Sequence, residues 1–210
     1  MLDGIDLHDA QGAVEWHRVA DAGNRFAFVR AAYGDRADKM VAQNYAGAKA
    51  AGLATGLYHF YRATRTPEAQ ANLMVSIIQN LHAGPGDLPP VLDVEDNPNY
   101  DGDWDTKNNA AYIAGLQTWI AAVSAAVKGT PIIYTRASFW NLIGKPSGFA
   151  NCPLWVAHYT NASSPNLPSG WADYALWQYS EAGHVDGVSG QCDVNRFNGG
   201  AADLEAMKVR

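Results

Sequence analysis

The sequence predicts an α/β fold, a modified TIM-like (β/α) barrel with eight strands and about five helices whose last strands lack covering helices. Through the first two thirds of the 210 residues, short apolar runs alternate with helical patterns, which is typical of parallel βαβ units. In the last third, loops rich in Ser, Pro, Gly and Asn replace the helices. No repeat or low-complexity linker divides the chain, so we expect residues 1–210 to form a single domain.

Apolar runs bounded by turn residues predict the strands. They lie at residues 4–7, 26–31, 55–61, 89–96, 131–135, 154–159, 174–179 and 188–194. The fourth run ends in two acids, Asp93 and Glu95. The last three runs are separated by loops instead of amphipathic segments, which predicts that this side of the barrel is not covered by long helices.

Apolar side chains at helical spacing predict helices over residues 11–22, 40–51, 67–81 and 107–127. The first two end at Gly23 and Gly52, and the third begins at Pro67, a residue favoured in the first turn of a helix. The fourth contains the most apolar window of the chain. Polar residues interrupt that window and its large side chains recur at helical spacing, so a buried helix explains it better than a membrane span.

The composition argues against several classes of protein. A formal net charge of −6 without any Lys/Arg run disfavours nucleic acid or an anionic membrane as a partner. The G-x-S-x-G elbow and the Walker loop are absent, and the sequence predicts no cofactor. Cys152 and Cys192 lack C-x-x-C spacing, so we expect no zinc site, and they form either one disulfide or two buried thiols. We expect a monomer.

The stretch Pro89–Asp96 places two acids at the end of a buried strand. Side chains alternate across a strand, so Asp93 and Glu95 are expected to project to the same side. Two carboxyls held close together raise the pKa of at least one of them, which then stays protonated near neutral pH while the other is ionised. Glycosidic bond cleavage requires such a pair. A lone D-x-E motif is more often a pair of solvated or capping acids, so its context decides the interpretation.

In a (β/α) barrel the chemistry lies at the carboxyl ends of the strands. Acids, aromatic rings and hydrogen-bonding groups occupy those ends in this sequence: Asp6, Arg30, Tyr58, His59, Phe60, Asp93, Glu95, Tyr134, His158, Tyr159, Gln178, Tyr179 and Asp193. The spacing of the histidines and acids matches no metal-ligand signature, so we expect no metal.

Flat aromatic faces suit pyranose rings, and four aromatic residues near strand ends are candidates for a sugar-binding cleft: Tyr58, Tyr134, Tyr159 and Trp177. Roughly half of the Tyr and Trp residues should belong to the core by their usual burial. Trp16 and Trp119, on predicted helices, are expected there.

Three polar residues complete the set of substrate-binding candidates, namely Gln178, Arg30 and His59. Arg30 is expected either to neutralise a substrate carboxylate or to form a structural ion pair with Asp6. His59 is favoured as a hydrogen-bonded structural residue beneath the site, with a role as a base as the alternative.

Six short motifs follow one another along nearly the whole chain. They are Asp3–Asp6 (D-G-I-D), Gly56–Phe60 (G-L-Y-H-F), Pro90–Glu95 (P-V-L-D-V-E), Leu154–Tyr159 (L-W-V-A-H-Y), Leu176–Ser180 (L-W-Q-Y-S) and Cys192–Asn195 (C-D-V-N). In this order they resemble the glycoside hydrolases of family 25, the Chalaropsis-type lysozymes. Each motif is weak alone, but six in the family's order are specific.

The resemblance implies an N-acetylmuramidase, a catalytic domain that cleaves the β-1,4 bond between N-acetylmuramic acid and N-acetylglucosamine in bacterial peptidoglycan. By motif position, four acids are implied to surround the cleavage point: Glu95 as the general acid, with Asp93, Asp6 and Asp193. Two alternatives stay open, a catalytically silent wall-binding module and a chitinase-like or glucosaminidase-like hydrolase. Crowded acids argue against the silent module, because a pure binder gains nothing from like charges.

The chain departs from the family pattern at His8, where serine is usual, and at residues 30–34, where R-A-A-Y-G replaces K-A-T-E-G. These departures concern substrate contacts at the rim. After protonation of the leaving oxygen by Glu95, either Asp6 or Asp93 guides a water, or the 2-acetamido group of the substrate attacks with Asp93 orienting it. The D-x-E arrangement favours the acetamido route.

The first residues contain neither a basic n-region nor an apolar h-region, so the sequence predicts no secretory signal in this chain. We expect action on the bacterial cell wall, as a phage endolysin released through holin pores or, as the second possibility, as a trimmed secreted enzyme.

Overall fold

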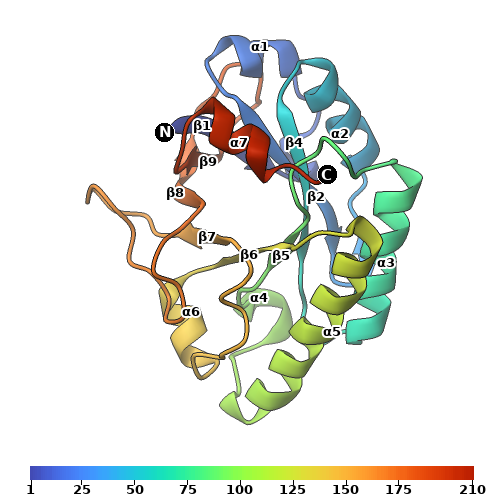
Figure 1. Ribbon diagram of the computed structural model, residues 1–210, viewed down its shortest axis with the longest axis vertical. Helices are drawn as coiled ribbons and strands as arrows, with labels where there is room; N and C mark the ends of the chain where they lie inside the picture. The colour runs from blue at the N-terminus through green and yellow to red at the C-terminus, as the bar shows by residue number, and fades with distance from the viewer.

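A computed structural model describes residues 1–210 and contains a closed barrel of eight strands (Figure 1). In sheet order the ring runs β1–β9–β8–β7–β6–β5–β4–β2 and closes where β2 pairs with β1. A two-residue strand, β3 (Arg36–Ala37), pairs only with the end of β2. The modified (β/α) barrel that the sequence predicts is confirmed.

Seven of the barrel strands run parallel to one another, and β9 runs antiparallel to both of its neighbours. The strands are β1 (Leu2–Leu7), β2 (Phe26–Tyr33), β4 (Ala54–Phe60), β5 (Val91–Asp93), β6 (Ile132–Thr135), β7 (Leu154–Ala157), β8 (Leu176–Gly183) and β9 (Cys192–Phe197). The expected last strand at residues 188–194 was placed too early. Gly190 within it has a φ of 79°, a left-handed conformation that turns the chain before β9 begins.

The helices are α1 (Trp16–Asp21), α2 (Val41–Ala50), α3 (Pro67–Asn80), α4 (Pro98–Asp101), α5 (Asn109–Val127), α6 (Ala137–Leu142) and α7 (Ala201–Met207), with 3₁₀ turns η1 (Asp9–Gln11) and η2 (Thr106–Asn108). The helix expected over residues 11–22 is divided, because Gly12 adopts a φ of 65° between η1 and α1. No helix connects β7 to β8 or β8 to β9, as expected.

Large aromatic and branched side chains fill the inside of the barrel. Phe28 and Trp155 stack there with ring centroids 4.8 Å apart, and both are fully buried. Leu204 of α7 packs on the same cluster, beside Phe26 and Phe197. Phe26 begins the parallel strand β2, and Phe197 pairs with Leu2 at the start of β1. α7 therefore closes the barrel at the amino ends of the parallel strands.

A second, larger core lies between the barrel and its covering helices. The buried face of α5 contributes Leu116, Trp119 and Val123 to it, and Met74 of α3 packs in the same cluster. The stretch Thr106–Val127 is long and apolar enough to cross a membrane by length and composition alone. Here one face of it packs on the barrel, as expected of a core helix.

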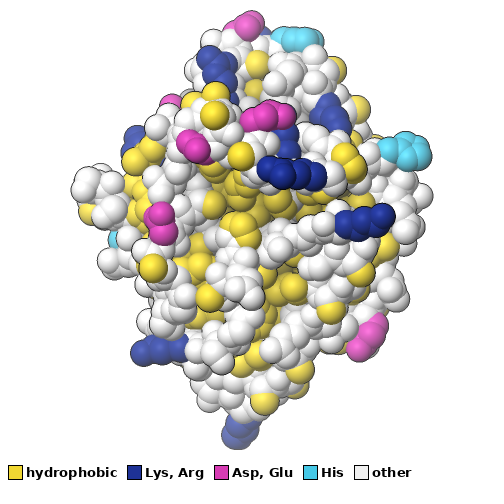
Figure 2. Space-filling view, in the orientation of Figure 1, with side chains coloured by type: hydrophobic (Ala, Val, Ile, Leu, Met, Phe, Trp, Pro, Cys, Tyr) yellow, Lys and Arg dark blue, Asp and Glu magenta, His cyan; other side chains and the backbone are white.

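Charged side chains are sparse on the face that carries α7. Figure 2 shows hydrophobic side chains gathered in the middle of this face, with basic and acidic side chains placed singly around them. The basic residues form no stripe on this face, which agrees with the absence of Lys/Arg runs in the sequence.

Cys152 and Cys192 are two free, buried thiols, so the disulfide considered from the sequence does not form in this structure. The direction of β9 explains the separation. Cys152 precedes the parallel strand β7, whereas Cys192 opens the antiparallel strand β9, and these two positions lie at opposite ends of the barrel. Burial raises the pKa of each thiol to about 11.

The tight interior predicts that Gly56→Ala destabilises the protein. A Cβ at Gly56 would lie 2.3 Å from the Phe28 ring and 3.1 Å from the Leu88 Cβ, so the barrel interior would be overpacked. We expect the free energy of unfolding, measured by urea denaturation, to fall by about 1–3 kcal/mol. Gly84→Ala is the matched control, because its Cβ would meet nothing within 4 Å. Equal effects of the two substitutions would contradict this account of the interior.

Candidate active site

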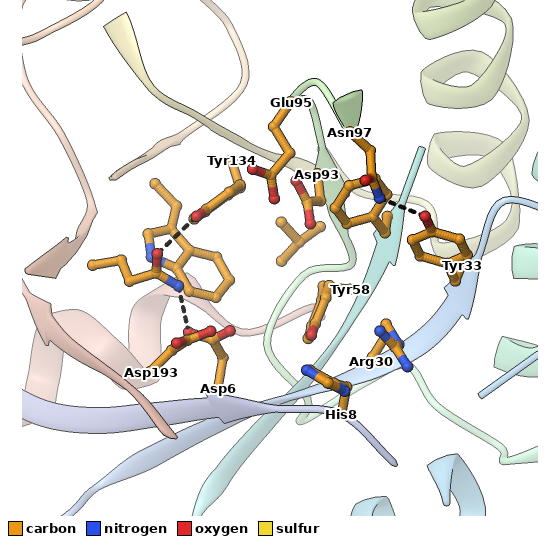
Figure 3. A pocket seen from close by; sticks show the side chains of 14 residues that line it. Asp6, His8, Arg30, Tyr33, Tyr58, Asp93, Glu95, Asn97, Tyr134 and Asp193 are labelled. Carbon is orange, nitrogen blue, oxygen red and sulfur yellow. Dashed lines mark hydrogen bonds between the residues drawn. The ribbon is translucent and has the colours of Figure 1, made fainter. Parts of the chain in front are cut away.

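A cavity of about 250 Å³ opens at the carboxyl ends of the parallel strands (Figure 3). Its walls are acids, polar groups and aromatic rings: Asp6, His8, Arg30, Tyr33, Tyr58, Phe60, Val91, Asp93, Glu95, Asn97, Tyr134, Trp155, Gln178 and Asp193. All four acids that the motifs single out therefore line one cavity. Of the other candidates, Arg30, Tyr58, Tyr134 and Gln178 line it as well.

Asp6 and Asp193 face each other because of strand pairing. In the antiparallel register of β1 with β9, Asp6 lies directly opposite Asp193. We had expected Asp193 at the carboxyl end of its strand. It is instead the second residue of β9, and the reversed direction of β9 brings that amino end to the mouth of the barrel.

The Asp6–Asp193 pair holds a proton. Asp6 Oδ2 accepts hydrogen bonds from Gln178 Nε2 at 2.9 Å and Asn195 Nδ2 at 2.8 Å. Burial raises the pKa of Asp6, while these hydrogen bonds and one shared with Asp193 lower it. Burial and the charge of Asp6 raise the pKa of Asp193 to about 9. At neutral pH Asp193 therefore carries the proton and donates it to the Asp6 carboxylate.

Asp93 and Glu95 project into the same space, as alternation along a strand requires (Figure 3). β5 itself ends at Asp93, but the Val94 amide donates to the Tyr134 carbonyl at 2.8 Å and extends the strand geometry to Glu95. Asp93 is 5% exposed, whereas 26% of the Glu95 side chain is exposed. Both acids line the cavity, and Glu95 is the more exposed of the two.

Burial, the Glu95 carboxyl and Asp6 raise the pKa of Asp93 well above its usual range. Burial also raises the pKa of Glu95, to about 7, although Arg136 opposes this rise from 3.8 Å away. A hydrogen bond shared by the two carboxyls raises the pKa of Asp93 and lowers that of Glu95. Glu95 therefore titrates near neutral pH, beside a neighbour whose pKa burial also raises.

Arg30 lines the cavity but does not pair with Asp6, which corrects one of our expectations. Its guanidinium binds Asp9 at 2.6 Å and Asp38 at 2.8 Å. Its charge still lowers the pKa of Asp93, against the larger effect of burial. Arg30 is a structural ion-pair residue that also contributes positive potential to the cavity wall.

Two tyrosines and one amide connect the far wall of the cavity to Asp6. Tyr134 and Tyr159 both donate their hydroxyls to Gln178 Oε1, at 2.7 and 2.8 Å. Gln178 Nε2 in turn donates to Asp6 (Figure 3). Tyr159 is 49% exposed and lines an adjoining cavity, so its ring is available to a ligand.

Trp177 does not reach the cavity, in contrast to its place among the substrate-binding candidates. His59 does not reach it either, in agreement with the favoured interpretation of a structural residue beneath the site. Trp177 is 1% exposed, packs on Val156, and donates its Nε1–H to the His158 carbonyl at 2.8 Å. His59 is fully buried, and its Nδ1 accepts from Trp119 at 3.1 Å while its Nε2 contacts the Gly34 carbonyl at 2.7 Å. Burial lowers the pKa of His59 to about 4, which makes it a neutral structural residue.

Four residues of the cavity wall were not among the predicted site residues: Val91, Trp155, Tyr33 and Asn97. Trp155 alternates with Val156 along β7, and this alternation alone could have indicated that Trp155 faces the barrel interior. Tyr33, the last residue of β2, is joined to Asn97, which precedes α4, by a hydrogen bond between the Asn97 amide and the Tyr33 hydroxyl (Figure 3). No local pattern indicated that contact.

Glu95 lies where three cavities adjoin. It lines the central cavity, a second one of about 310 Å³ beside α5, and a third one of about 390 Å³ that contains Arg136, His158 and Tyr159. The three together form a groove across the mouth of the barrel, and Glu95 is the residue common to all of them. Such an arrangement can bind an extended ligand on both sides of one titratable carboxyl.

Comparisons with known proteins agree on one family. Residues 5–188 match the family model described as Glycosyl hydrolases family 25. Lysozyme M1 of Streptomyces globisporus is 38% identical over 98% of this chain and 71% of its own length. The N,O-diacetylmuramidase of Chalaropsis sp is 29% identical over 98% of each protein. The crystal structure of the bacterial lysozyme from Streptomyces coelicolor matches with a TM-score of 0.87 at 36% identity, covering 99% of this chain and 96% of that one.

The crowded acids predict that Asp193→Asn stabilises the protein. Asn still offers an N–H donor to Asp6 but does not titrate. Because the folded pKa of Asp193 is about 9 and the unfolded value is lower, folding takes up a proton, and the stability that Asp193 contributes is lost as pH rises. We expect the substitution to add about 1–3 kcal/mol to the free energy of unfolding at pH 8 and much less at pH 5. The measurement is urea denaturation at both pH values. The control is Asp3→Asn on exposed β1 sequence, and an equal gain at both pH values would argue against a shared proton.

Proposed function

The chain belongs to the family 25 glycosyl hydrolases and is a muramidase that hydrolyses peptidoglycan, and from this premise we propose that Glu95 is its general acid. The groove across the barrel mouth is where we propose that the glycan binds. The observation that carries the proposal is the position of Glu95, the residue common to three adjoining cavities, with a pKa near 7. A carboxyl with this pKa keeps a proton at neutral pH and can release it to a leaving oxygen.

The substrate in this proposal is the β-1,4 bond between N-acetylmuramic acid and N-acetylglucosamine. Cleavage passes through an oxocarbenium-like state, which needs a proton on the leaving oxygen and negative charge near the anomeric carbon. Glu95 supplies the proton. Burial raises the pKa of Asp6, but Gln178 and Asn195 donate hydrogen bonds that favour its carboxylate form, and we propose that this carboxylate supplies the negative charge.

For the step that follows, we propose attack by the 2-acetamido oxygen of the substrate on the anomeric carbon. As that bond forms, the bond to the leaving oxygen breaks and the leaving oxygen takes the Glu95 proton. Asp93 lines the central cavity and its buried Oδ1 atom has no hydrogen-bond partner in the protein, so Asp93 is the acceptor that we propose for the acetamido N–H. Water then opens the cyclic intermediate and returns a proton to Glu95. A water guided by Asp6 or Asp93 is the alternative first nucleophile.

Bacterial peptidoglycan is the polymer on which the enzyme acts, and we propose that it does so as a monomer without nucleic acid or membrane as a partner. The net charge of −6 and the absence of a Lys/Arg run support this. Release as a phage endolysin through holin pores is our preferred setting, and a trimmed secreted enzyme is the second.

Glu95→Gln tests the general acid directly. We expect this variant to clear a peptidoglycan suspension at least about 100-fold more slowly than the wild type, because the amide has no proton to give at the leaving oxygen. Mass spectrometry of wild-type products should find muramic acid at the new reducing ends, and early NMR spectra should show the retained β configuration that acetamido attack requires.

Several outcomes would contradict the proposal. Unchanged clearing by Glu95→Gln would remove Glu95 as the acid, and glucosamine at the new reducing ends would indicate a glucosaminidase. Inverted products would indicate direct attack by water. Glu205→Gln, on exposed α7, is the matched control and should clear at the wild-type rate.

The pH dependence follows from the same carboxyl. Since the general acid must be protonated, the rate should fall as pH rises through about 7, the pKa of Glu95. Arg136 lowers this pKa, so Arg136→Met should move the alkaline limb to higher pH, by about 0.5–1 unit for a partly exposed ion pair. Initial rates on soluble glycan across pH 4–9 measure this limb. An alkaline limb that stays in place in Arg136→Met would show that another group sets it.

A further inference from the structure

The second cavity, beside Glu95, has a chemistry that cleavage of the glycan backbone does not use. It has a volume of about 310 Å³ and is lined by the segment between β4 and α3, by the loop that carries α4 and η2, and by the start of α5. Neutral acetylated sugars need hydrogen-bonding groups and flat apolar faces. This cavity has such groups, but it also has more carboxylates than they require.

Four aspartates line this cavity: Asp96, Asp101, Asp103 and Asp105. Two are neutralised, because Asp96 pairs with Arg136 and Asp101 pairs with Arg62. Arg65 also lines the cavity, but its guanidinium pairs with Asp35 at 3.2 Å. The charges of Asp103 and Asp105 are therefore not balanced by any ion pair.

Asp103 and Asp105 differ in what else they do. Asp105 Oδ1 accepts the Lys107 amide at 3.0 Å and caps η2. The Asp103 side chain makes no hydrogen bond or ion pair and is exposed at the cavity. Asp103 is thus the acid whose removal should disturb the fold least.

A buried phenol points to a ligand in the same cavity. Tyr112 is 4% exposed, and its hydroxyl has no hydrogen-bond partner in the protein. The pKa of this hydroxyl is raised by burial and by the charges of Tyr61, Asp93, Glu95 and Asp96. The hydroxyl therefore lies within the field of these acids. An unpaired buried hydroxyl costs stability, and a bound group that pairs with it removes that cost.

The rings around this hydroxyl complete the site. Trp104 packs edge-to-face on Tyr112 with centroids 4.7 Å apart, and both residues line the cavity. An ammonium group has three donors and no acceptor, and it is attracted to carboxylates, to a phenol oxygen and to aromatic faces. The cavity offers all three at once.

We propose that this second cavity binds an alkylammonium group carried by the peptidoglycan substrate. The proposal rests on the function proposed above and names a part of the substrate beyond the cleaved bond. Two sources carry this chemistry: the diamino acid at the third position of the stem peptide, and a de-N-acetylated amino sugar. Three extended residues span about 10 Å, so a stem that begins at a sugar in the central cavity can reach the adjoining one.

The test compares wall substrates that differ only in amine charge. The first is a lysine-type peptidoglycan with free amino groups, and the second is the same material after N-acetylation. We expect wild-type kcat/KM to fall about three- to tenfold on acetylation, mainly through KM, the size expected of an exposed ion pair assisted by an aromatic contact. Asp103→Asn should already be weakened on the free-amine wall and should lose most of this sensitivity.

Two further variants separate binding from folding. Tyr112→Phe keeps the ring and removes the unpaired hydroxyl, so we expect a Tm no lower than that of the wild type together with a reduced sensitivity to acetylation. Asp21→Asn, on exposed sequence at the end of α1, removes one negative charge far from the groove and should behave as the wild type does.

Stem-free glycan distinguishes the two sources of the amine. If the stem supplies it, removing the stems lowers wild-type kcat/KM as much as acetylation does. If an amino sugar supplies it, partly de-N-acetylated stem-free glycan is cleaved better than the fully acetylated form, and Asp103→Asn removes the difference. The proposal would be overturned if wild-type kcat/KM did not depend on the amine charge of any substrate. It would also be overturned if kcat/KM of Asp103→Asn fell on acetylation as much as that of the wild type. Cleavage of stem-free glycan by the wild type, lost in Glu95→Gln, would leave the general-acid proposal intact in either case.

Discussion

The pairing of β9 with β1 is the constraint on which the rest of the structure depends. It joins the last strand to the first within the ring that the β1–β2 pairing closes, and because β9 runs against its neighbours it sets Asp193 directly opposite Asp6 at the mouth. A parallel last strand would present its carboxyl end there and would carry Asp193 toward the closed end of the barrel. The strand pairing that places β9 in the barrel therefore also brings Asp193 next to Asp6.

The acid cluster is stable because it shares protons, and this sharing creates its chemistry. Two pairs of carboxyls are buried together, and burial raises the pKa of all four. Asp193 takes the proton in the first pair, and in the second pair Glu95, which is more exposed than Asp93, titrates near pH 7. Arg136 and Arg30 moderate the field without neutralising it, because each is also bound to other aspartates. An electrostatic arrangement that weakens the fold thus tunes one proton for transfer.

Local patterns in the sequence predicted most of the barrel and the acids of the site. The parallel strands, the long helices and the D-x-E pair follow from periodicities of two and 3.6, which are properties of neighbouring residues. What failed depends on contacts between distant residues. The direction of β9 decides that Cys152 and Cys192 stay apart, and Arg30 selects Asp9 and Asp38 over Asp6 because the loop after β1 and the turn after β3 meet there. Trp177 was predicted to line the cleft, but Trp155 is the tryptophan that points into the barrel. The motif does not show which of the two points inward, because pairing with adjacent strands decides it.

The closed end of the barrel has a practical consequence for anything joined to this enzyme. β1 starts there, and Val209 returns there to exchange backbone hydrogen bonds with Gly86 and Asp87, so both chain ends emerge on the side opposite the groove. A tether, label or solid support attached at either terminus would leave the groove facing outward. Immobilised in that way, the molecule would present its cutting surface to an insoluble sheet of cell wall without a change in the barrel.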